Sequence, residues 1–296
     1  MASPAVLAYP TRTGEAQMTY RQEPVLWSDD EERSVRPLDA EQLATYESEG
    51  FLVLPGYLGD GPVASLRDAV EALARDKRRA GDPRYVLGAD ADDVRRVQGL
   101  HFDDGPIAAL VRSDVLAGAA RQILGDEVYV HHSRANRMPG TFGEGFPWHA
   151  DFERWHAEDG MPAMRALGVS VSLSPTDEFG GALVLAPGSH RTFISVAGNQ
   201  QGEAPTGWDY RREPDLYCID AVLDSCGIAR VDAGPGTVVL FDSNALHATL
   251  PNLSPDPVLS LFVAYNSVSN ALGEPRNGRA PRPEFVASRD FTPLPS

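Results

Sequence analysis

Three side chains of this sequence could together hold a divalent metal ion: His149, Asp151 and His247. His149 and Asp151 stand two residues apart in GFPWHADF, and an extended chain points such residues to the same face. His247 follows the apolar stretch GTVVLFDSN, so we expect it on a short loop after a strand. Two imidazoles and one carboxylate on one face of an octahedral ion leave three positions open, as in non-haem Fe(II) sites that use O2.

This metal interpretation competes with structural roles for the same residue types. A His two residues before an Asp is common by chance, and an isolated His more often bonds a backbone carbonyl. The other histidines that we assign to such structural roles are His101, His131, His156 and His190. Residues 158–160 (EDG) lack the alternating ligands of a calcium loop and are interpreted as a turn with a helix-start charge. No GxSxG motif, no Cys near a His and no Gly-rich phosphate loop occur in the sequence.

The metal-ligand candidates belong to a half of the chain that is rich in strand patterns. Alternating or short apolar runs bounded by Gly, Pro, Asn or Asp predict strands at 128–136, 166–175, 181–189, 236–244 and 259–268. Before them, capping signals and helical periodicity predict helices at about 40–49, 61–77 and 106–124, and a short strand at 51–58. The fold class is therefore mainly β with supporting α-helices, a sandwich or jelly roll.

The order of these patterns predicts a single domain over residues 1–296. Residues 1–38 are expected to form an extended N-terminal arm, 39–125 a mostly helical support, 126–270 the jelly-roll core and 271–296 a C-terminal extension. Residues 194–215 are a polar, Gly-containing loop that is long enough to act as a lid.

Charge and composition argue against several classes of partner. The chain of 296 residues carries a formal charge of −16, so it should repel nucleic acid and anionic membranes. Its adjacent arginines are interpreted as solvated pairs rather than as a phosphate-binding track: Arg78-Arg79, Arg95-Arg96 and Arg211-Arg212. No apolar run approaches the ~20 residues that span a bilayer, and the N-terminus lacks the pattern of a signal peptide.

The two cysteines, Cys218 and Cys226, fit no zinc spacing. We interpret them as free thiols in a reducing compartment and therefore expect a cytoplasmic protein. The expected partner is a small-molecule substrate. The sequence leaves the oligomeric state open, a homodimer included.

Several longer stretches resemble one enzyme family. They are, in chain order, YPTR, RQEPV, ARQILGDEVYVH, SRAN, WHADFERWHAEDGMPAMRAL, GGALVLAPGSHRTF, FDSNALH, YNSVSNAL and RPEFVASRDFTP. In them the chain resembles the ectoine hydroxylases within the phytanoyl-CoA dioxygenase family of Fe(II)/2-oxoglutarate oxygenases. The resemblance implies a double-stranded β-helix, a jelly roll of the cupin kind, in agreement with the strand patterns. It also implies Fe(II), 2-oxoglutarate and O2 as the cofactor and co-substrates.

The resemblance also assigns residues to the site. The iron ligands fall on the three residues named first, His149, Asp151 and His247. For 2-oxoglutarate, it matches two residues of SRAN, Arg134 and Asn136, and Thr249 can donate a hydroxyl to a carboxylate of this molecule. The matches to the substrate pocket are Trp155, Ser170, Phe241 and Phe262. Their aromatic rings suit the enclosure of a compact cyclic zwitterion.

This chain departs from the family pattern at four positions near the site. His132 stands where the family has Gln, and Gln98 where an aromatic residue is expected; both are expected to contact the substrate. Arg154 stands where the family has Thr, and Val258 where it has an Arg that pairs with the distal carboxylate of 2-oxoglutarate. Losing that Arg removes a charge-assisted contact of about 1.5–3 kcal/mol. Either another cation holds this carboxylate, with Arg154 as the candidate, or co-substrate use differs.

The function expected from the sequence is hydroxylation by a non-haem Fe(II)/2-oxoglutarate-dependent dioxygenase. The expected substrate is a small, cyclic, zwitterionic, amino-acid-like metabolite: ectoine, a proline- or pipecolate-type compound, or a specialised metabolite. Two alternatives stay open: an iron protein of the same fold with altered co-substrate use, and a metal- or ligand-binding relative without turnover. Succinate formation tests the first alternative, and iron stoichiometry tests the second.

Overall fold

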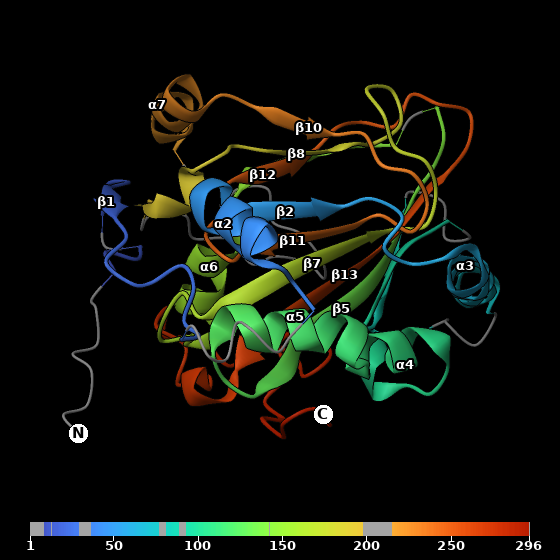
Figure 1. Ribbon diagram of the computed structural model, residues 1–296, viewed down its shortest axis with the longest axis horizontal. Coiled ribbons are helices and arrows are strands. Elements are labelled where there is room, and N and C mark those ends of the chain that lie inside the picture. The colour runs from blue at the N-terminus through green and yellow to red at the C-terminus, as the bar shows by residue number, and fades with distance from the viewer. Residues whose placement is uncertain are drawn as a thin grey trace.

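Two β-sheets that share a core build most of the molecule. The computed structural model describes residues 9–12, 14–29, 37–76, 81–88, 93–141, 143–197 and 215–295. In this part of the chain, the strands form a seven-stranded sheet, a four-stranded sheet and a two-stranded ribbon. Figure 1 shows the smaller sheet above the larger one, with helices beneath the larger. This arrangement confirms the predicted jelly roll with supporting helices.

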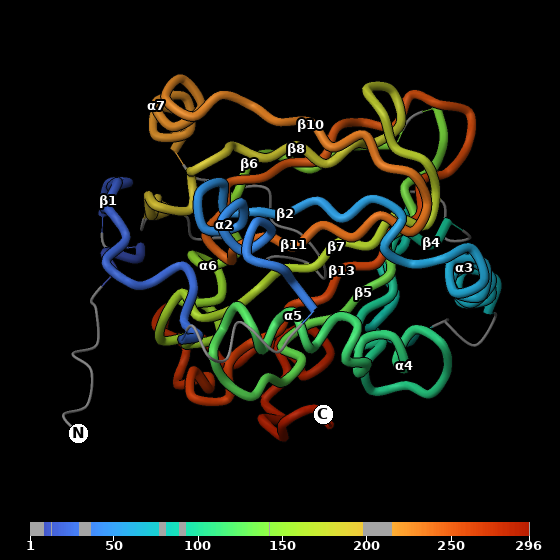
Figure 2. Tube along the Cα trace, viewed as in Figure 1, coloured from blue at the N-terminus to red at the C-terminus, as the bar shows by residue number. Residues whose placement is uncertain are grey.

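The strands of the larger sheet follow the order β2-β11-β7-β13-β5-β4-β3. Their bounds, in that order, are Phe51–Leu54, Val238–Asp242, Ala166–Ser172, Val258–Ser267, Val128–Met138, Val94–Gln98 and Tyr85–Leu87. The smaller sheet has the order β10-β8-β12-β6, and its strands lie together at the top of Figure 2. Their bounds are Ala229–Val231, Leu183–Leu185, His247–Thr249 and Phe146–His149. The strands predicted from the second half of the sequence are thus confirmed.

Local capping signals determine helix α2, Ala40–Glu49, as the sequence predicts. The Asp39 side chain accepts a hydrogen bond from the backbone of Gln42, whose side chain accepts one from the backbone of Asp39. This capping box satisfies two backbone donors at the helix start. Gly50 ends the helix with a φ of 80°, a left-handed conformation that favours glycine. Helix α3, Asp60–Arg75, confirms the second predicted helix.

The helix predicted over residues 106–124 is in fact two helices. They are α4, Pro106–Arg112, and α5, Asp114–Leu124, and they meet at Ser113. Ser113 has an extended backbone, and its hydroxyl donates to the carbonyl of Leu110 at 2.6 Å. Serine offers the backbone such alternatives to a helical conformation, so the helix breaks although the apolar pattern continues through this point.

The larger sheet presents two different faces. Residues at alternate positions pack with the helices in an aliphatic core that includes Val97, Ala135, Val169, Leu259 and Leu261. The intervening positions face the smaller sheet and include Val239, Phe241, Phe262 and Ala264. Because successive residues of a strand point to opposite faces, the same strands hold the fold together on one side and present side chains to the intersheet space on the other.

Both ends of the described chain pack against this framework. In the N-terminal arm, β1 (Met18–Tyr20) pairs with β9 (Thr192–Ile194), and Arg21 Nη1 donates to Asp242 Oδ2 at 2.7 Å. In the C-terminal extension, the backbone of Leu294 donates to the carbonyl of Val128 on β5. The terminal segments therefore contact the sheets that carry the predicted site.

The helical pattern around the two cysteines forms α7, Leu216–Cys226. Cys218 and Cys226 are both free thiols, as predicted. Of the segment predicted as a lid, residues 198–214 lie outside the described residues, as do the predicted solvated pairs Arg78-Arg79 and Arg211-Arg212.

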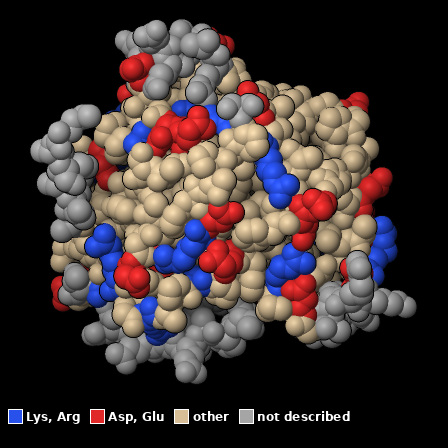
Figure 3. All heavy atoms as spheres, turned by 90° about the horizontal axis from the view of Figure 1, so that it is seen from below, with Lys and Arg blue, Asp and Glu red and all other residues tan. Residues whose placement is uncertain are grey.

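Charged side chains of both signs are interspersed on the face drawn in Figure 3. Among the described residues on this face, no continuous basic stripe is visible. In the described part of the chain, no helix combines the length and the apolar character that a membrane crossing needs.

Candidate metal centre

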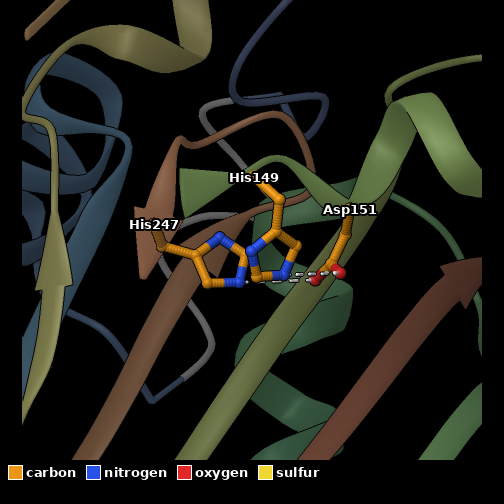
Figure 4. A group of neighbouring side chains, drawn as sticks. All are labelled: His149, Asp151 and His247. Atoms are coloured by element: carbon orange, nitrogen blue, oxygen red, sulfur yellow. Dashed lines mark ion pairs between the residues drawn. The ribbon is translucent and has the colours of Figure 1, made fainter. Parts of the chain in front are cut away.

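The smaller sheet and the turn that follows β6 bring the three predicted ligands together. His149 ends β6, His247 begins β12, and the two are register partners in the antiparallel pairing of these strands. Asp151 is the first residue of the short helix α6, Asp151–Arg154. In Figure 4 the two imidazole rings and the carboxylate point toward one another. Strand pairing thus joins two distant segments of the sequence in one site.

The distances within this group suit a single metal ion. One ligand atom from each of the three residues lies within 4.8 Å of the others. Asp151 Oδ1 is 3.8 Å from His149 Nε2, and Asp151 Oδ2 is 3.9 Å from His247 Nε2. Ligand bonds of about 2.0–2.2 Å to one ion would need only a small contraction of the group.

Hydrogen bonds aim both imidazoles at the shared centre. His149 Nδ1 lies 2.9 Å from the carbonyl oxygen of Pro147, and His247 Nδ1 lies 2.9 Å from that of Ala245. A carbonyl only accepts, so each Nδ1 carries the proton and each Nε2 lone pair is directed to the centre. Burial first, and then the neighbouring His247, lower the pKa of His149 well below its usual value, which keeps the His149 ring in the neutral, metal-binding form.

Two of the converging atoms are buried and make no hydrogen bond to the described residues: His149 Nε2 and Asp151 Oδ2. Buried polar atoms ordinarily have a partner. A cation bound between the three side chains would satisfy both atoms. The donor set of two imidazoles and one carboxylate is the one that non-haem Fe(II) oxygenases use, so the residues fit Fe(II).

A cavity of about 490 Å³ opens beside this group. Its volume falls within the range of about 300–1,000 Å³ that is typical of small-molecule sites. The smaller sheet contributes His149 and His247 to its wall. The inner face of the larger sheet contributes Arg96, Arg134, Asn136, Ser170, Ser260 and Phe262.

Aromatic rings and a buried guanidinium form the wall nearest the metal ligands. The ring centroid of Phe241 lies 4.8 Å from that of His247 and 6.0 Å from that of Phe262. The guanidinium carbon of Arg134 lies 4.2 Å from the Phe262 ring centroid. Burial lowers the pKa of Arg134 to about 10, while the charge of Asp151 acts in the opposite direction. Arg134 therefore stays a cation at neutral pH and places a fixed positive charge in the site.

A glycine on β7 makes room for one of these rings. Gly168 is the register partner of Phe241. A Cβ atom at position 168 would lie 2.5 Å from Cε2 of the Phe241 ring. The missing side chain thus lets this ring lie over β7, where it contacts His247.

The residues interpreted as a turn at 158–160 are part of a buried ion network. Glu158 and Asp159 are both buried and end a π-helical segment that follows α6, so the turn interpretation is wrong. Arg12 Nη1 lies 3.2 Å from Glu158 Oε1, and Arg154 Nε donates to Glu158 Oε2 at 2.9 Å. Burial would raise the pKa of Glu158, but the neighbouring guanidinium groups, Arg154 first, lower it to about 2.

Asp159 connects the C-terminal extension to the same segment. Arg282 donates two hydrogen bonds to the Asp159 carboxylate, at 2.7 and 2.6 Å. His131 Nε2 lies 3.2 Å from this carboxylate, and the His131 ring packs edge-on against Trp155 at 5.0 Å. Side chains from both terminal segments therefore hold the stretch of chain that follows the candidate ligand Asp151.

The residues assigned from the family resemblance divide into two groups. Those that line the cavity are Arg134, Asn136, Ser170, Phe241, Thr249 and Phe262. Those that the structure places outside its lining are Gln98, His132, Arg154 and Trp155. Two of these lie beside residues of the wall: Gln98 is the register partner of Arg134, and the His132 ring lies 5.8 Å from that of Phe262.

Sequence reasoning missed some of the polar lining. The missed residues include Arg96, Ser172 and Ser260. Interpreting Arg96 as solvated is wrong, because it is half-buried and its Nε donates to Asn136 Oδ1 at 3.1 Å. The available signal is spacing: Arg96 lies two residues before Gln98 and therefore shares its face of the strand.

The other four histidines make contacts of the structural kind that the sequence analysis assigned to them. These contacts are His101 to Ser133 Oγ (2.6 Å), His131 to Asp159 Oδ2 (3.2 Å), His156 to the Met161 carbonyl (2.7 Å) and His190 to the Glu47 carbonyl (3.2 Å).

Comparison with known proteins identifies the family. The model of the phytanoyl-CoA dioxygenase (PhyH) family matches residues 46–257. The chain belongs to the phytanoyl-CoA dioxygenase family. Its similarity to the ectoine dioxygenase of Nocardia farcinica is 40% identity over 296 residues, covering 97% of this chain and 95% of that relative. The ectoine dioxygenase of Bordetella bronchiseptica is 41% identical over 293 residues, covering 98% and 94%.

A solved structure agrees over nearly the whole chain. EctD from S. alaskensis with bound Fe superimposes with a TM-score of 0.87 at 35% identity, covering 98% of this chain and 97% of that one. The same protein has been solved with 2-oxoglutarate and 5-hydroxyectoine, with a TM-score of 0.85 at 36% identity. Together with the ligand geometry, these findings show an Fe(II)/2-oxoglutarate-dependent dioxygenase of the jelly-roll fold.

Proposed function

We propose that this dioxygenase hydroxylates ectoine, or a cyclic zwitterion of closely similar size and charge. The observation that carries the proposal is the two-His, one-carboxylate group opening onto a cavity with both an aromatic and a cationic wall. Full-length similarity to ectoine dioxygenases supports the choice of substrate class.

The roles of the metal-side residues follow from their chemistry. His149, Asp151 and His247 would hold Fe(II) and leave its remaining face toward the cavity. Bound iron, with 2-oxoglutarate and O2, supplies the oxidation that puts one oxygen atom into a substrate C–H bond while 2-oxoglutarate becomes succinate and CO2. Around it, we assign binding of 2-oxoglutarate to Arg134, Asn136 and Thr249, with Arg154 as the further candidate from the sequence.

The aromatic wall suits the other ligand. The rings of Phe241 and Phe262 both line the cavity, and aromatic rings there would favour a delocalised positive charge. Ser170, on the neighbouring strand, adds a hydroxyl that can bond a polar group of the substrate. We assign substrate contacts also to Trp155, His132 and Gln98. Enclosure by these residues would exclude water and strengthen every polar contact in the site.

The proposed location is the cytoplasm. Both thiols, Cys218 and Cys226, are free, which suits a reducing compartment. The substrate is a small molecule.

The direct test is product analysis. The Fe(II)-loaded enzyme would be incubated in air with 2-oxoglutarate and, separately, ectoine, L-proline and L-pipecolate. We expect a product 16 mass units heavier than ectoine, and succinate equal to that product in amount. Proline and pipecolate should give much less product.

Omission of 2-oxoglutarate is the control and should abolish the product. Succinate that forms at the same slow rate with and without each compound would contradict the proposed substrate. Oxidised product without succinate would instead show altered co-substrate use.

A further inference from the structure

A row of polar side chains crosses the inner face of the larger sheet beside the metal centre. Arg96 on β4 is the register partner of Asn136 on β5, Asn136 of Ser260 on β13, and Ser260 of Ser172 on β7. All four line the cavity. Neighbouring strands are about 4.8 Å apart, and hydrogen bonds join Arg96 to Asn136 and Asn136 to Ser260. The row therefore brings a cation, an amide and a hydroxyl close enough to bind one small anion.

The rows on either side of this polar row differ from it. Toward the metal centre, the next inward row contains Arg134 and its register partner Phe262. In the opposite direction, the next inward row pairs Met138 with Val258. Val258 Cγ2 lies 3.6 Å from the position that a Cβ of Gly181 would take, so this end of the cavity is apolar. A carboxylate that extends from the metal centre past the row of Arg134 and Phe262 would therefore find hydrogen-bond donors in the row of Arg96.

We propose that Arg96 pairs with the distal carboxylate of 2-oxoglutarate, and that Asn136, Ser260 and Thr249 complete its hydrogen bonds. The proposal rests on the proposed function, because it requires the 2-oxo acid end of the molecule to be held at His149, Asp151 and His247.

Orientation favours Arg96 over the other guanidinium groups near the centre. Arg154, which the sequence suggests for this role, donates to Glu158 and does not line the cavity. Arg134 lies close enough to Asp151 for their charges to interact, which places it at the metal end. The hydrogen bond from Arg96 Nε to Asn136 Oδ1, 3.1 Å long, fixes the plane of the guanidinium. A planar guanidinium held in this way can bind a carboxylate through two parallel N–H groups.

The other two arginines in the wall of the cavity are paired with an acidic residue directly before β4. Arg95 Nε lies 2.5 Å and Arg137 Nη1 lies 3.3 Å from the Asp93 carboxylate. Both alternate with inward-facing residues of their strands, so their side chains start from the opposite face. Of the two arginines on β4, Arg96 is therefore the one whose side chain starts from the inner face.

The test is an anaerobic titration of the Fe(II)-loaded protein, following the visible absorption band that 2-oxo acids give when they chelate Fe(II). Two probes are compared: 2-oxoglutarate, and 2-oxopentanoate, which has the same chelating end and no distal carboxylate. In Arg96→Gln, the dissociation constant for 2-oxoglutarate should rise about 10- to 100-fold, the usual effect of losing a charge-assisted hydrogen bond. The dissociation constant for 2-oxopentanoate should stay as it is in the wild type.

Three further variants sharpen the assignment. Arg84→Gln removes an arginine that is ion-paired with Asp82 and Asp103 at the same edge of the sheet, outside the cavity lining, and should leave both constants unchanged. Arg154→Gln should affect 2-oxoglutarate much less than Arg96→Gln does. Adding Val258→Arg to Arg96→Gln puts a guanidinium back into the same cavity and should recover much of the lost affinity.

The outcomes separate the two levels of the proposal. Wild-type binding of 2-oxoglutarate in Arg96→Gln, or an equal loss for both acids, would overturn the role of Arg96 and leave the proposed function intact. A selective loss in Arg154→Gln instead would move the role to Arg154. Absence of the band with either acid in the wild type would overturn the proposed function itself. If Arg96→Gln does not fold, Arg96→Lys serves instead, because lysine keeps the charge but lacks the two parallel N–H groups. This variant should weaken 2-oxoglutarate binding selectively by several-fold. Unchanged binding would overturn the proposal.

Discussion

The two faces of the seven-stranded sheet use the same strands for different purposes. Along β13, Leu259, Leu261 and Val263 pack against the helices, while Ser260 and Phe262 face the cavity. Because side chains alternate, a register shift of one residue would exchange the two sets. The outer face is aliphatic and contributes burial; the inner face is polar and aromatic and contributes binding. Stability and chemistry can therefore be changed separately, residue by residue, except where the two faces meet.

The largest expected effect on chemistry, with little effect on stability, comes from removing a metal ligand. Loss of a residue that only hydrogen-bonds to a metal ligand lowers metal affinity or activity roughly 10–100-fold. His247→Ala removes a ligand itself, so iron affinity and turnover should fall by more than this. The thermal unfolding midpoint without metal should change little. Iron content per chain and circular dichroism measure both effects. His190→Ala is the matched control and should keep its iron; full iron content in His247→Ala would refute the ligand assignment.

The buried ion pair at the end of β11 should couple the stability of the fold with the binding of iron. Arg21 and Asp242 form an ion pair with side chains only 2% exposed, and Asp242 also accepts from the backbone of Asn244, shortly before His247. Arg21→Met should cost about 3–5 kcal/mol of unfolding free energy, because it leaves a buried carboxylate unpaired. Iron affinity should fall with it.

Urea unfolding and iron titration of Arg21→Met measure these two effects. Arg230→Met, which breaks an exposed pair with Asp232, is the control and should change neither quantity appreciably. Iron affinity that stays at the wild-type value in Arg21→Met would show that this end of the sheet does not position His247.

A truncation on the outer face should affect stability alone. Leu261 is 1% exposed, so Leu261→Ala should cost about 2–5 kcal/mol of unfolding free energy. Iron affinity of the folded protein should match the wild type. The adjacent inner-face change, Ser260→Ala, should do the reverse: little effect on urea unfolding and weaker binding of 2-oxoglutarate. Equal weakening of 2-oxoglutarate binding by the two variants would contradict the separation of the faces.

The smallest expected effect concerns the ion network beside the metal centre. The pKa of Glu158 falls from its usual 4.5 to about 2 in the folded protein. A carboxyl with a depressed folded-state pKa stabilises the fold above pH 4.5, and this contribution is lost as the pH falls toward about 2. Glu158→Gln should therefore flatten the loss of stability across that window. Urea unfolding at several acidic pH values measures the slope, and an unchanged slope would refute this role for Glu158.

The sequence predicts features that depend on local pattern or direct spacing. Capping residues around Asp39 and Gln42 determine α2, and alternation determines β5, β7 and β13. His149 and Asp151 are close in the sequence, so their convergence follows from an extended backbone. From the residues alone His247 is a candidate because it follows an apolar strand, and the family resemblance supports it. Its distance to β6 depends on which strands pair, which local sequence patterns do not determine.

Features that depend on long-range contact were not predicted. The sequence predicts a turn at Glu158 and Asp159, because acidic residues beside Gly are typical of exposed loops. Their partners, Arg12 and Arg282, come from opposite ends of the chain, so local pattern does not reveal these ion pairs. The sequence analysis interprets Arg96 as solvated because it stands in a run of charged residues. Only its pairing with Asn136 shows that it faces inward.

Isotope labelling tests the central claim most directly. The anaerobic complex of enzyme, Fe(II), 2-oxoglutarate and ectoine would be exposed to isotopically labelled O2, and the products analysed by mass spectrometry. A dioxygenase acting on ectoine should place one labelled oxygen atom in succinate and the other in hydroxylated ectoine, apart from any exchange with water. Labelled succinate that forms at the same rate without ectoine, with no labelled product, would contradict the claim.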